Sequence, residues 1–316
     1  MTATLDTVGD LDTLNRLLGP LEMRAGWNKQ EPSLWPRPRT KFKPAHWDWS
    51  SARAALDSAG RLISAEQAER RNLFLVNPCE DNYYETLRTL VSAYQMILPG
   101  EKARSHRHTP NALRLVLDVA DACYTIVDGV ELEMAPGDVL LTPGWSWHGH
   151  GNNGSKPGYW IDFLDVPLVQ LLEPMFLEFH PDGLEKAVSK TRASTFVMSY
   201  AQTESRLDAA RPDQRGRLVV SLDHTSMPTI GMDMERIEAG RTTLRERTTA
   251  NQIIAVVSGE GTTQVGDTRL AWKRGDVIAV PTWHDYAHTA TRDTVLFCVS
   301  DRVAQEKLGF LKVEFS

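Results

Sequence analysis

The sequence predicts an all-β fold made of two similar barrels. The first observation is a series of short apolar runs after residue 71, separated by Gly, Pro or Asp, as is typical of strands in a barrel. The second is a similar strand-rich block over residues 218–301. The third is internal repetition: "RHTPNALRLVLDVADACYTIVDG" matches "ERTTANQIIAVVSGEGTTQVGD", and "APGDVLLTPGWSW" matches "KRGDVIAVPTW".

The composition is that of a soluble globular protein with room for two domains: 316 residues, 41% hydrophobic, with 9 tryptophans. No apolar run approaches the roughly 18 residues of a membrane span, and the start lacks signal-peptide features. The net charge of −6, without a basic stripe, argues against nucleic acid as a partner. Cys79, Cys123 and Cys298 are odd in number and widely spaced, which predicts free thiols and a cytoplasmic location.

The N-terminal segment predicts short helices around an extended arm. A helix is expected over residues 11–18, stopped by Gly-Pro. Residues 32–49 contain four prolines, which exclude regular structure, and their tryptophans are expected to bury against a core or a neighbouring subunit. A further helix is expected over 50–60, with a Ser N-cap and a Gly stop, and another within 63–71, where S-x-x-Q predicts a capping box.

The strand-like runs of the first barrel cover residues 71–76, 90–98, 112–119 and 122–129. The expected organisation is an N-terminal arm with helices (1–70), a first, catalytic barrel (71–167), a helical linker (168–217) and a second barrel (218–316).

Three histidines are candidate metal ligands. Residues two apart on a strand share a face, so His106 and His108 point the same way. His148 follows the Gly137-Asp138 turn, and a barrel would fold that strand back beside the first one. Three imidazoles leave about half of an octahedral ion's positions open, which favours Fe(II), although Zn, Mn and Ni also accept imidazole. The alternative is three core histidines that are hydrogen-bonded to the backbone.

The second barrel carries "RERT" (residues 245–248) where the first carries "HRHT". His284 and His288 remain there without an H-x-H pair, so no metal is expected. A structural role, with a subunit interface as its use, is the expectation.

Arg114 has the same strand parity as the two histidines and is expected to point into the same cavity. A buried arginine needs a partner. Its planar fork suits the carboxylate of an anionic substrate. An internal ion pair with Asp118 or Asp162 is the alternative, and the sequence leaves both open.

The turn–strand–turn piece around Gly-Asp resembles the cupin superfamily, whose barrel is a double-stranded β-helix. Longer stretches resemble the gentisate 1,2-dioxygenase family of bicupins, which includes salicylate, 1-hydroxy-2-naphthoate and 5-nitrosalicylate dioxygenases. These stretches are AERRNLFLVNP, YQMILPGEKARSHRHTPNALRL, MAPGDVLLTPGWSWHGHGN, WIDFLD and VLFCVSDRVAQEKLG.

The resemblance implies Fe(II) held by His106, His108 and His148, and Arg114 as the anchor for a substrate carboxylate. It further implies that Gln95, His150, Asp162 and one arginine of the Arg70-Arg71 pair contact or surround the substrate. His150 is either an acid–base catalyst or a hydrogen-bond partner within its turn. The family also suggests a homotetramer.

The implied reaction opens a 2-hydroxybenzoate between its carboxyl- and hydroxyl-bearing carbons, with O₂ as co-substrate and no flavin or nicotinamide. Val91, Phe163 and "DVADACYT" depart from the family's usual residues, so plain gentisate is not the default substrate. The alternatives are a metal-dependent isomerase or decarboxylase on the same scaffold, which would not need O₂, and a non-catalytic protein that binds a small acid.

Overall fold

The computed structural model describes residues 4–30, 32–222 and 225–316, and the chain divides into two compact units, Met1–Arg39 and Thr40–Ser316. The first unit contains η1 (Leu5–Thr7), α1 (Leu11–Leu18) and η2 (Gly19–Leu21). The helix predicted over residues 11–18 is confirmed: Asp10 caps α1 by accepting a hydrogen bond from the Thr13 backbone.

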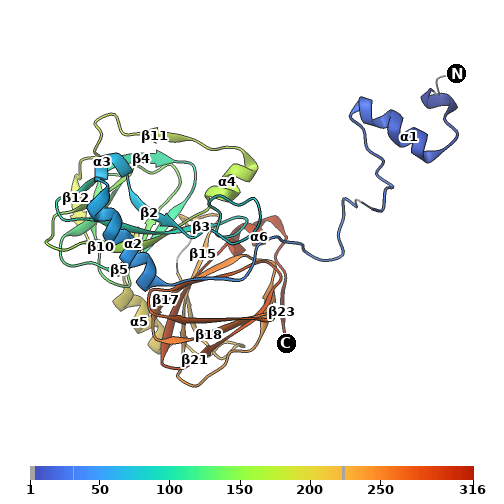
Figure 1. The fold of residues 1–316 in the computed structure, drawn as a ribbon. Coiled ribbons are helices and arrows are strands. Elements are labelled where there is room, and N and C mark those ends of the chain that lie inside the picture. Colours follow the sequence, from blue (N-terminus) through green and yellow to red (C-terminus); the bar gives the residue numbers. More distant parts are fainter. Residues whose placement is uncertain (1–3, 31, 223–224) are drawn as a thin grey trace. The chain divides into compact units, whose positions relative to one another are not determined.

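The second unit holds two barrels, so the predicted all-β bicupin is confirmed (Figure 1). The first barrel pairs the sheet β13-β8-β5-β10-β3-β2, here called the site sheet, with β11-β4-β9-β6-β7-β12. The second barrel pairs β1-β20-β17-β22-β15-β14, here called the facing sheet, with β19-β18-β21-β16-β23.

β1 (Ala45–Trp47) belongs to the facing sheet of the second barrel. The strands of the first barrel are β2 (Arg71–Phe74), β3 (Val91–Ile97), β4 (Lys102–His108), β5 (Ala112–Asp118), β6 (Cys123–Val127), β7 (Val130–Glu133), β8 (Val139–Thr142), β9 (His148–Asn152), β10 (Gly158–Leu164), β11 (Leu177–Phe179), β12 (Ser189–Thr191) and β13 (Val197–Met198). Those after it are β14 (Leu218–Ser221), β15 (Gly231–Ile237), β16 (Glu246–Thr248), β17 (Gln252–Ser258), β18 (Glu260–Val265), β19 (Thr268–Lys273), β20 (Val277–Val280), β21 (Asp285–Ala290), β22 (Thr294–Ser300) and β23 (Val313–Phe315). The helices are α2 (Trp49–Leu62), α3 (Ala65–Ala68), α4 (Val166–Leu172), α5 (Tyr200–Ala209) and α6 (Arg302–Leu308).

The helices before the first barrel differ in detail from the prediction. The N-cap of α2 is Asp48, and the helix continues through Gly60 to Leu62. Gly60 is therefore not a stop signal: a Cβ there would lie 2.8 Å from the Met96 side chain, so the glycine permits close packing on β3. The predicted capping box between Ser64 and Gln67 is confirmed, on a helix of four residues.

The proline-rich arm contains one regular element that the prediction excluded. Residues 45–47 form β1, which pairs with β20, and Pro44 stands just before it, where no strand hydrogen bond is lost. Burial against a core is confirmed for Trp49, which is 6% exposed, but the expectation is wrong for Trp35, which is 54% exposed. The linker is likewise less helical than expected, because β11, β12 and β13 join the first barrel's sheets.

The segments that precede each barrel dock on the other barrel (Figure 1). Trp49, at the start of α2, donates its backbone N–H to Asp276 at 2.9 Å, beside the turn of the second barrel. Gly275 in that turn has φ +89°, and a Cβ on it would lie 2.4 Å from the Trp49 ring. Only glycine fits at this position.

The first barrel repeats this arrangement. The backbone N–H of Tyr200, at the start of α5, donates to Asp138 at 2.9 Å. Gly137 has φ +84°, and a Cβ would lie 2.7 Å from the Tyr200 ring. β13 pairs with β8 as β1 pairs with β20. Each barrel thus has one Gly-Asp turn, and the segment that precedes the other barrel in the chain docks on it.

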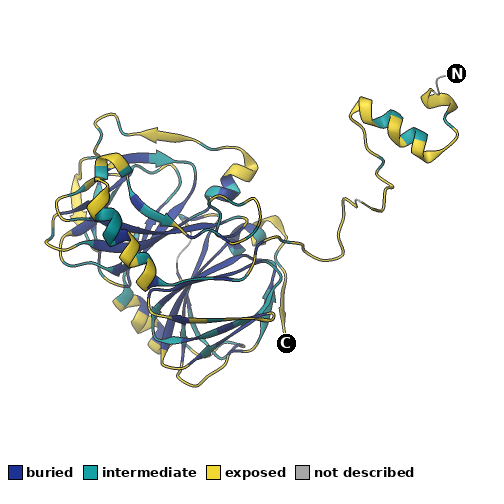
Figure 2. Ribbon diagram, in the orientation of Figure 1, coloured by how far each residue is buried: buried dark blue, intermediate teal, exposed yellow. Residues whose placement is uncertain are grey.

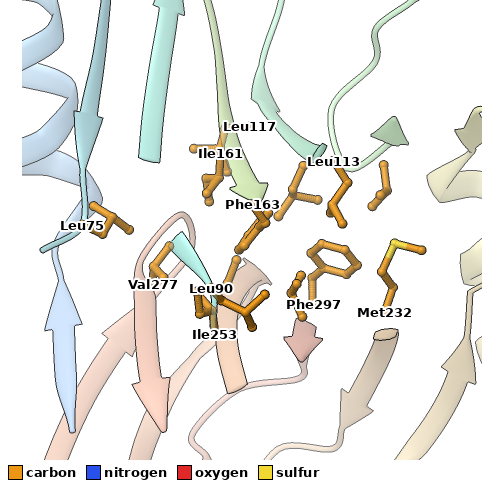
Figure 3. Close-up of a cluster of buried hydrophobic side chains, with 14 of the residues drawn as sticks. Leu75, Leu90, Leu113, Leu117, Ile161, Phe163, Met232, Ile253, Val277 and Phe297 are labelled. Atoms are coloured by element: carbon orange, nitrogen blue, oxygen red, sulfur yellow. The ribbon is translucent and has the colours of Figure 1, made fainter. Parts of the chain in front are cut away.

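The two barrels share one apolar core, shown in Figure 3. Phe163 of the site sheet meets Phe297 of the facing sheet edge to face, with ring centroids 5.7 Å apart. The central strands of both sheets are therefore buried on both faces, as their dark colour in Figure 2 shows. Within the described residues, no helix is long and apolar enough to cross a membrane.

Both barrels end in a helix and a short covering strand, which extends the duplication beyond the motifs that the sequence revealed. Leu177-Glu178-Phe179 (β11) lies on β4, and Val313-Glu314-Phe315 (β23) lies on β16. Glu178 pairs with Arg107, whose guanidinium lies over Trp145. Glu314 pairs with Arg247, which lies over Trp283.

We expect Phe297→Ala to lower the free energy of unfolding by about 3–5 kcal/mol, because the cavity would open between two packed sheets. Urea denaturation followed by circular dichroism measures the change. Leu172→Ala, at a side chain that is 66% exposed, serves as the control and should change it by less than about 0.5 kcal/mol. Equal stability of the Phe297 variant and the wild type would contradict a shared core.

Candidate active site

A cavity of about 380 Å³ lies inside the first barrel. Its walls come from both sheets and from the α4–β11 segment. Alternate residues of the site sheet face it, whereas the residues between them face the second barrel. The residues that line the cavity include Arg70, Asn72, Val91, Ala93, Gln95, His106, His108, Ala112, Arg114, His148, His150, Asp162 and Leu164.

The three predicted metal ligands converge in this cavity. His106 and His108 lie on one face of β4, and His148 stands opposite His106 in β9. Their ligand nitrogens all lie within 4.8 Å of one another, and no other group of this kind is found among the described residues. The Nδ1 atoms of His108 and His148 face the carbonyl oxygens of Pro110 and Ser146, at 2.8 and 3.0 Å. Nε2 of these two rings is therefore free for a metal ion, and with a nitrogen of His106 nearby the chemistry of the set fits one.

Burial keeps these imidazoles uncharged. It lowers the pKa of His106 to about 2 and, together with the nearby Arg70, the pKa of His108 to about 4. The pKa of His148 is lowered well below its ordinary value by burial and by the other two histidines. Neutral imidazole is the form that binds a metal, so the ligands are ready for it at neutral pH.

Arg114 is buried, and the structure gives it an internal partner. Its Nε lies 3.2 Å from a carboxylate oxygen of Asp162, and its Nη1 donates to Thr142 at 3.0 Å and Thr125 at 3.3 Å. Asp118, the other candidate partner, pairs instead with Arg53 on the surface. These bonds fix the guanidinium against the cavity wall while it still lines the cavity.

The two consecutive arginines before β2 diverge. Arg71 forms an ion pair with Glu101, with nitrogen–oxygen distances of 2.5 and 2.6 Å, and lies outside the cavity. Arg70 enters the cavity, and its Nη2 lies 2.8 Å from Nε2 of His106. Glu69 turns the chain at φ +52° just before it. Of the pair that the sequence could not resolve, Arg70 is the one that a ligand can reach.

Burial lowers the pKa of Arg70 to about 10, so it stays charged at neutral pH. Its Nη2 also lies 2.5 Å from Nδ1 of His106, so Arg70 covers both ring nitrogens and would have to turn away before either could hold a metal ion.

Gln95 and His150 also face the cavity, as expected. Gln95 is 4% exposed and lies beside Asn72 of the neighbouring strand. His150 is fixed by a 2.8 Å hydrogen bond between Nδ1 and the hydroxyl of Thr125. Burial, then Arg114 and Arg70, lower the pKa of His150 well below its ordinary value, so the ring is neutral.

Sequence reasoning missed two sets of residues. Thr125 and Thr142 hold Arg114, and their places on the inner faces of β6 and β8 were the available signal. The wall formed by Gln170, Met175 and Leu177 comes from the segment taken as linker. The repeated Leu/Val-Glu-Phe tripeptide near the end of each half was the only sequence sign of it.

The residues of the second barrel that correspond to the β4 histidines lie one position away from those that the sequence match had paired with them. In strand register, Glu246 faces Tyr286 as His106 faces His148, so Glu246, rather than Arg245, replaces His106. The gap-free match failed because the first half is two residues longer between β5 and β6: Arg114 and Ile254 are 140 residues apart, whereas Thr125 and Thr263 are 138 apart. Arg215, from the end of the linker, donates to the Tyr286 hydroxyl at 2.7 Å and pairs with Glu246 at 3.3 Å.

Comparison with known proteins agrees with this geometry. The cupin domain family matches residues 93–165 and 233–300, one span in each barrel. A gentisate 1,2-dioxygenase from Aquipseudomonas alcaligenes is 33% identical over 90% of each chain. The chain belongs to the gentisate 1,2-dioxygenase family of bicupins.

A 5-aminosalicylate 1,2-dioxygenase from a Comamonas species is 31% identical, over 96% of this chain and 90% of its own. The salicylate 1,2-dioxygenase of Pseudoaminobacter salicylatoxidans, solved with gentisate, superposes with a TM-score of 0.88 at 25% identity and covers 98% of both chains. The family assignment makes this chain a ring-cleaving dioxygenase.

We expect His148→Ala to lower the metal content from about one ion per chain to background, because two imidazoles do not hold a divalent ion firmly. Metal analysis after loading and gel filtration measures it. His288→Ala, which removes a buried histidine from β21 of the second barrel, is the control. Metal loss in the control, or retention in His148→Ala, would contradict the assigned site.

Proposed function

We propose that the chain is an Fe(II)-dependent dioxygenase that opens a 2-hydroxybenzoate between its carboxyl- and hydroxyl-bearing carbons, with O₂ as co-substrate. The observation that carries the proposal is the cavity itself: three neutral imidazoles and two arginines face one space of about 380 Å³. The relatives named for gentisate and 5-aminosalicylate support the substrate class.

His106, His108 and His148 would hold the iron through Nε2. Bound there, iron would supply open positions for substrate and O₂ and would lower the pKa of a coordinated hydroxyl.

Arg70 and Arg114 bind the substrate carboxylate in this proposal. The Nε of Arg114 donates a hydrogen bond to Asp162, and its Nη1 donates to Thr125 and Thr142. Nη2 is therefore the nitrogen that Arg114 can use to bind the substrate carboxylate. Arg70 would have to leave His106 for that ring to hold iron, and its guanidinium would then need a new partner, because its buried Nε has none among the described residues. A carboxylate between the two guanidinium groups satisfies both.

Gln95 and Asp162 complete the substrate site, Gln95 as a hydrogen-bonding wall and Asp162 by holding Arg114 in place. His150 is the proposed acid–base group for the substrate hydroxyl. Arg71 takes no part, because its ion pair with Glu101 keeps it outside.

One side of the cavity carries a row of apolar residues from three strands, whereas Tyr84 and Gln170 line it from other segments. Val91, Leu164 and Ala112 are neighbours in register across β3, β10 and β5, two residues from Ala93, Asp162 and Arg114. A ring held by its carboxylate at Arg114 therefore extends along an apolar row. We propose that salicylates with apolar substituents or a fused ring fit better than gentisate, whose second hydroxyl would lack a partner there.

The chain is proposed to act as a cytoplasmic homotetramer with the four-part organisation expected from the sequence. The buried thiols of Cys123 and Cys298 suit a reducing compartment, since both are free in the structure.

Anaerobically Fe(II)-reconstituted protein should consume O₂ with salicylate, 5-chlorosalicylate and 1-hydroxy-2-naphthoate, and less readily with gentisate and 5-nitrosalicylate. An oxygen electrode and the ultraviolet spectrum of the opened ring measure this. No uptake by iron-loaded protein with any of the five would favour an anaerobic isomerase or decarboxylase. Tight binding without any turnover would favour a non-catalytic acid-binding protein.

Arg70→Met should raise KM for salicylate by about 10- to 100-fold while iron stays bound, because one charge-assisted hydrogen bond is lost. Steady-state O₂ uptake and metal analysis measure the two quantities. Arg70 is a cleaner target than Arg114, whose removal would strand the buried Asp162. Arg53→Met, which removes a surface ion pair, is the control and should leave KM unchanged. An unchanged KM in Arg70→Met would remove Arg70 from the substrate site.

A further inference from the structure

Thr125 is a buried residue at the junction of two groups in the proposed site. It lies on β6 and is 0% exposed. Its hydroxyl oxygen lies 2.9 Å from the Gly149 carbonyl oxygen, 2.8 Å from Nδ1 of His150 and 3.3 Å from Nη1 of Arg114. One side chain thus contacts both the histidine and the arginine that face the substrate cavity.

The three contacts fix the direction of each hydrogen bond. A threonine hydroxyl has one proton to donate and two lone pairs to accept with. The Gly149 carbonyl can only accept, so it takes the proton. Arginine can only donate, so it takes one lone pair. The remaining contact then requires Nδ1 of His150 to carry its hydrogen and to donate it to Thr125.

This arrangement determines which face of His150 a ligand meets. A neutral imidazole has one N–H and one bare nitrogen, so a proton on Nδ1 leaves a lone pair on Nε2. Because Nδ1 is turned to Thr125 and His150 lines the cavity, Nε2 is the nitrogen that a bound molecule reaches.

We infer that Thr125 is a positioning residue: it holds His150 with Nε2 as a hydrogen-bond acceptor for the substrate hydroxyl and steadies Arg114 for the substrate carboxylate. The inference rests on the proposed function for its substrate. A 2-hydroxybenzoate carries one donor, the hydroxyl, beside one acceptor, the carboxylate. The cavity then offers the complementary pair, an acceptor at His150 and a donor at Arg114, both set by one hydroxyl.

The second barrel contains a matched control. The hydroxyl of Thr263 lies 2.7 Å from Nδ1 of His288, in the same relation as Thr125 to His150. In strand register, Ile254 faces Ile278 where Arg114 faces Leu140, so the arginine is missing there. Thr263→Val therefore removes the same threonine–histidine bond without touching the proposed site.

The kinetic experiment compares iron-loaded wild type, Thr125→Val, Thr125→Ser and Thr263→Val. We expect kcat/KM to fall by about 10- to 100-fold in Thr125→Val with iron content unchanged, as for other residues that orient a functional group. Thr125→Ser should recover to within about threefold of wild type, because its hydroxyl makes the same bonds. Thr263→Val should equal wild type. Wild-type kinetics in an iron-loaded Thr125→Val, or no recovery in Thr125→Ser, would overturn the inference.

A second readout does not depend on turnover. Nitrogen-15 NMR of histidine-labelled, metal-free protein reports which ring nitrogen of His150 is protonated, with the signal assigned from its absence in His150→Gln. We expect Nδ1–H in wild type and a mixture of tautomers in Thr125→Val. Nε2–H in wild type would overturn the inference whatever the activity. The Nδ1–H tautomer in a protein that consumes no O₂ would contradict the proposed function alone and support the placement of His150.

Discussion

The burial of the site sheet on both faces is the constraint on which the rest of the structure depends. One face packs on the second barrel through residues such as Leu113, Leu115 and Phe163, and the other lines the cavity. A slip of one residue in any of these strands would place Arg114 or Asp162 in the apolar core and a leucine in the cavity. The register of the site is thus held by the hydrophobic contact with the second barrel, whose described residues contain no histidine triad.

The exchange of docking segments reinforces that contact. The start of α2 docks on the Gly275-Asp276 turn of the second barrel, and the helix packs on strands of the first barrel. The start of α5 docks on the Gly137-Asp138 turn of the first barrel, and that helix packs on strands of the second. Each half is therefore anchored through a buried carboxylate and a glycine that no other residue could replace without a clash. The two halves are expected to unfold together, because neither retains its own docking partner when separated.

The duplicated halves solve the same electrostatic problem in two ways. Each barrel has a polar interior that a folded chain must satisfy. In the second barrel, the guanidinium of Arg215 fills the centre and pairs with Glu246 and Tyr286. In the first, the histidines stay neutral and Arg70 and Arg114 retain nitrogens for a ligand. The two halves thus carry different polar residues at corresponding inward-facing positions of a shared scaffold.

The first barrel also shows how burial prepares a site before any ligand arrives. The same desolvation that keeps the imidazoles uncharged strengthens the attraction between Arg114 and Asp162.

The sequence alone determined the bicupin fold, the histidine triad and the inward face of Arg114, because alternation along a strand and the spacing of Gly-Asp turns are local properties. It could not separate Arg70 from Arg71, since the strained turn at Glu69 sets that direction. It could not choose between a substrate and Asp162 as the partner of Arg114, nor find Thr125 or the wall formed by β11. Those depend on distances between strands far apart in the chain, which only the packed tertiary structure decides.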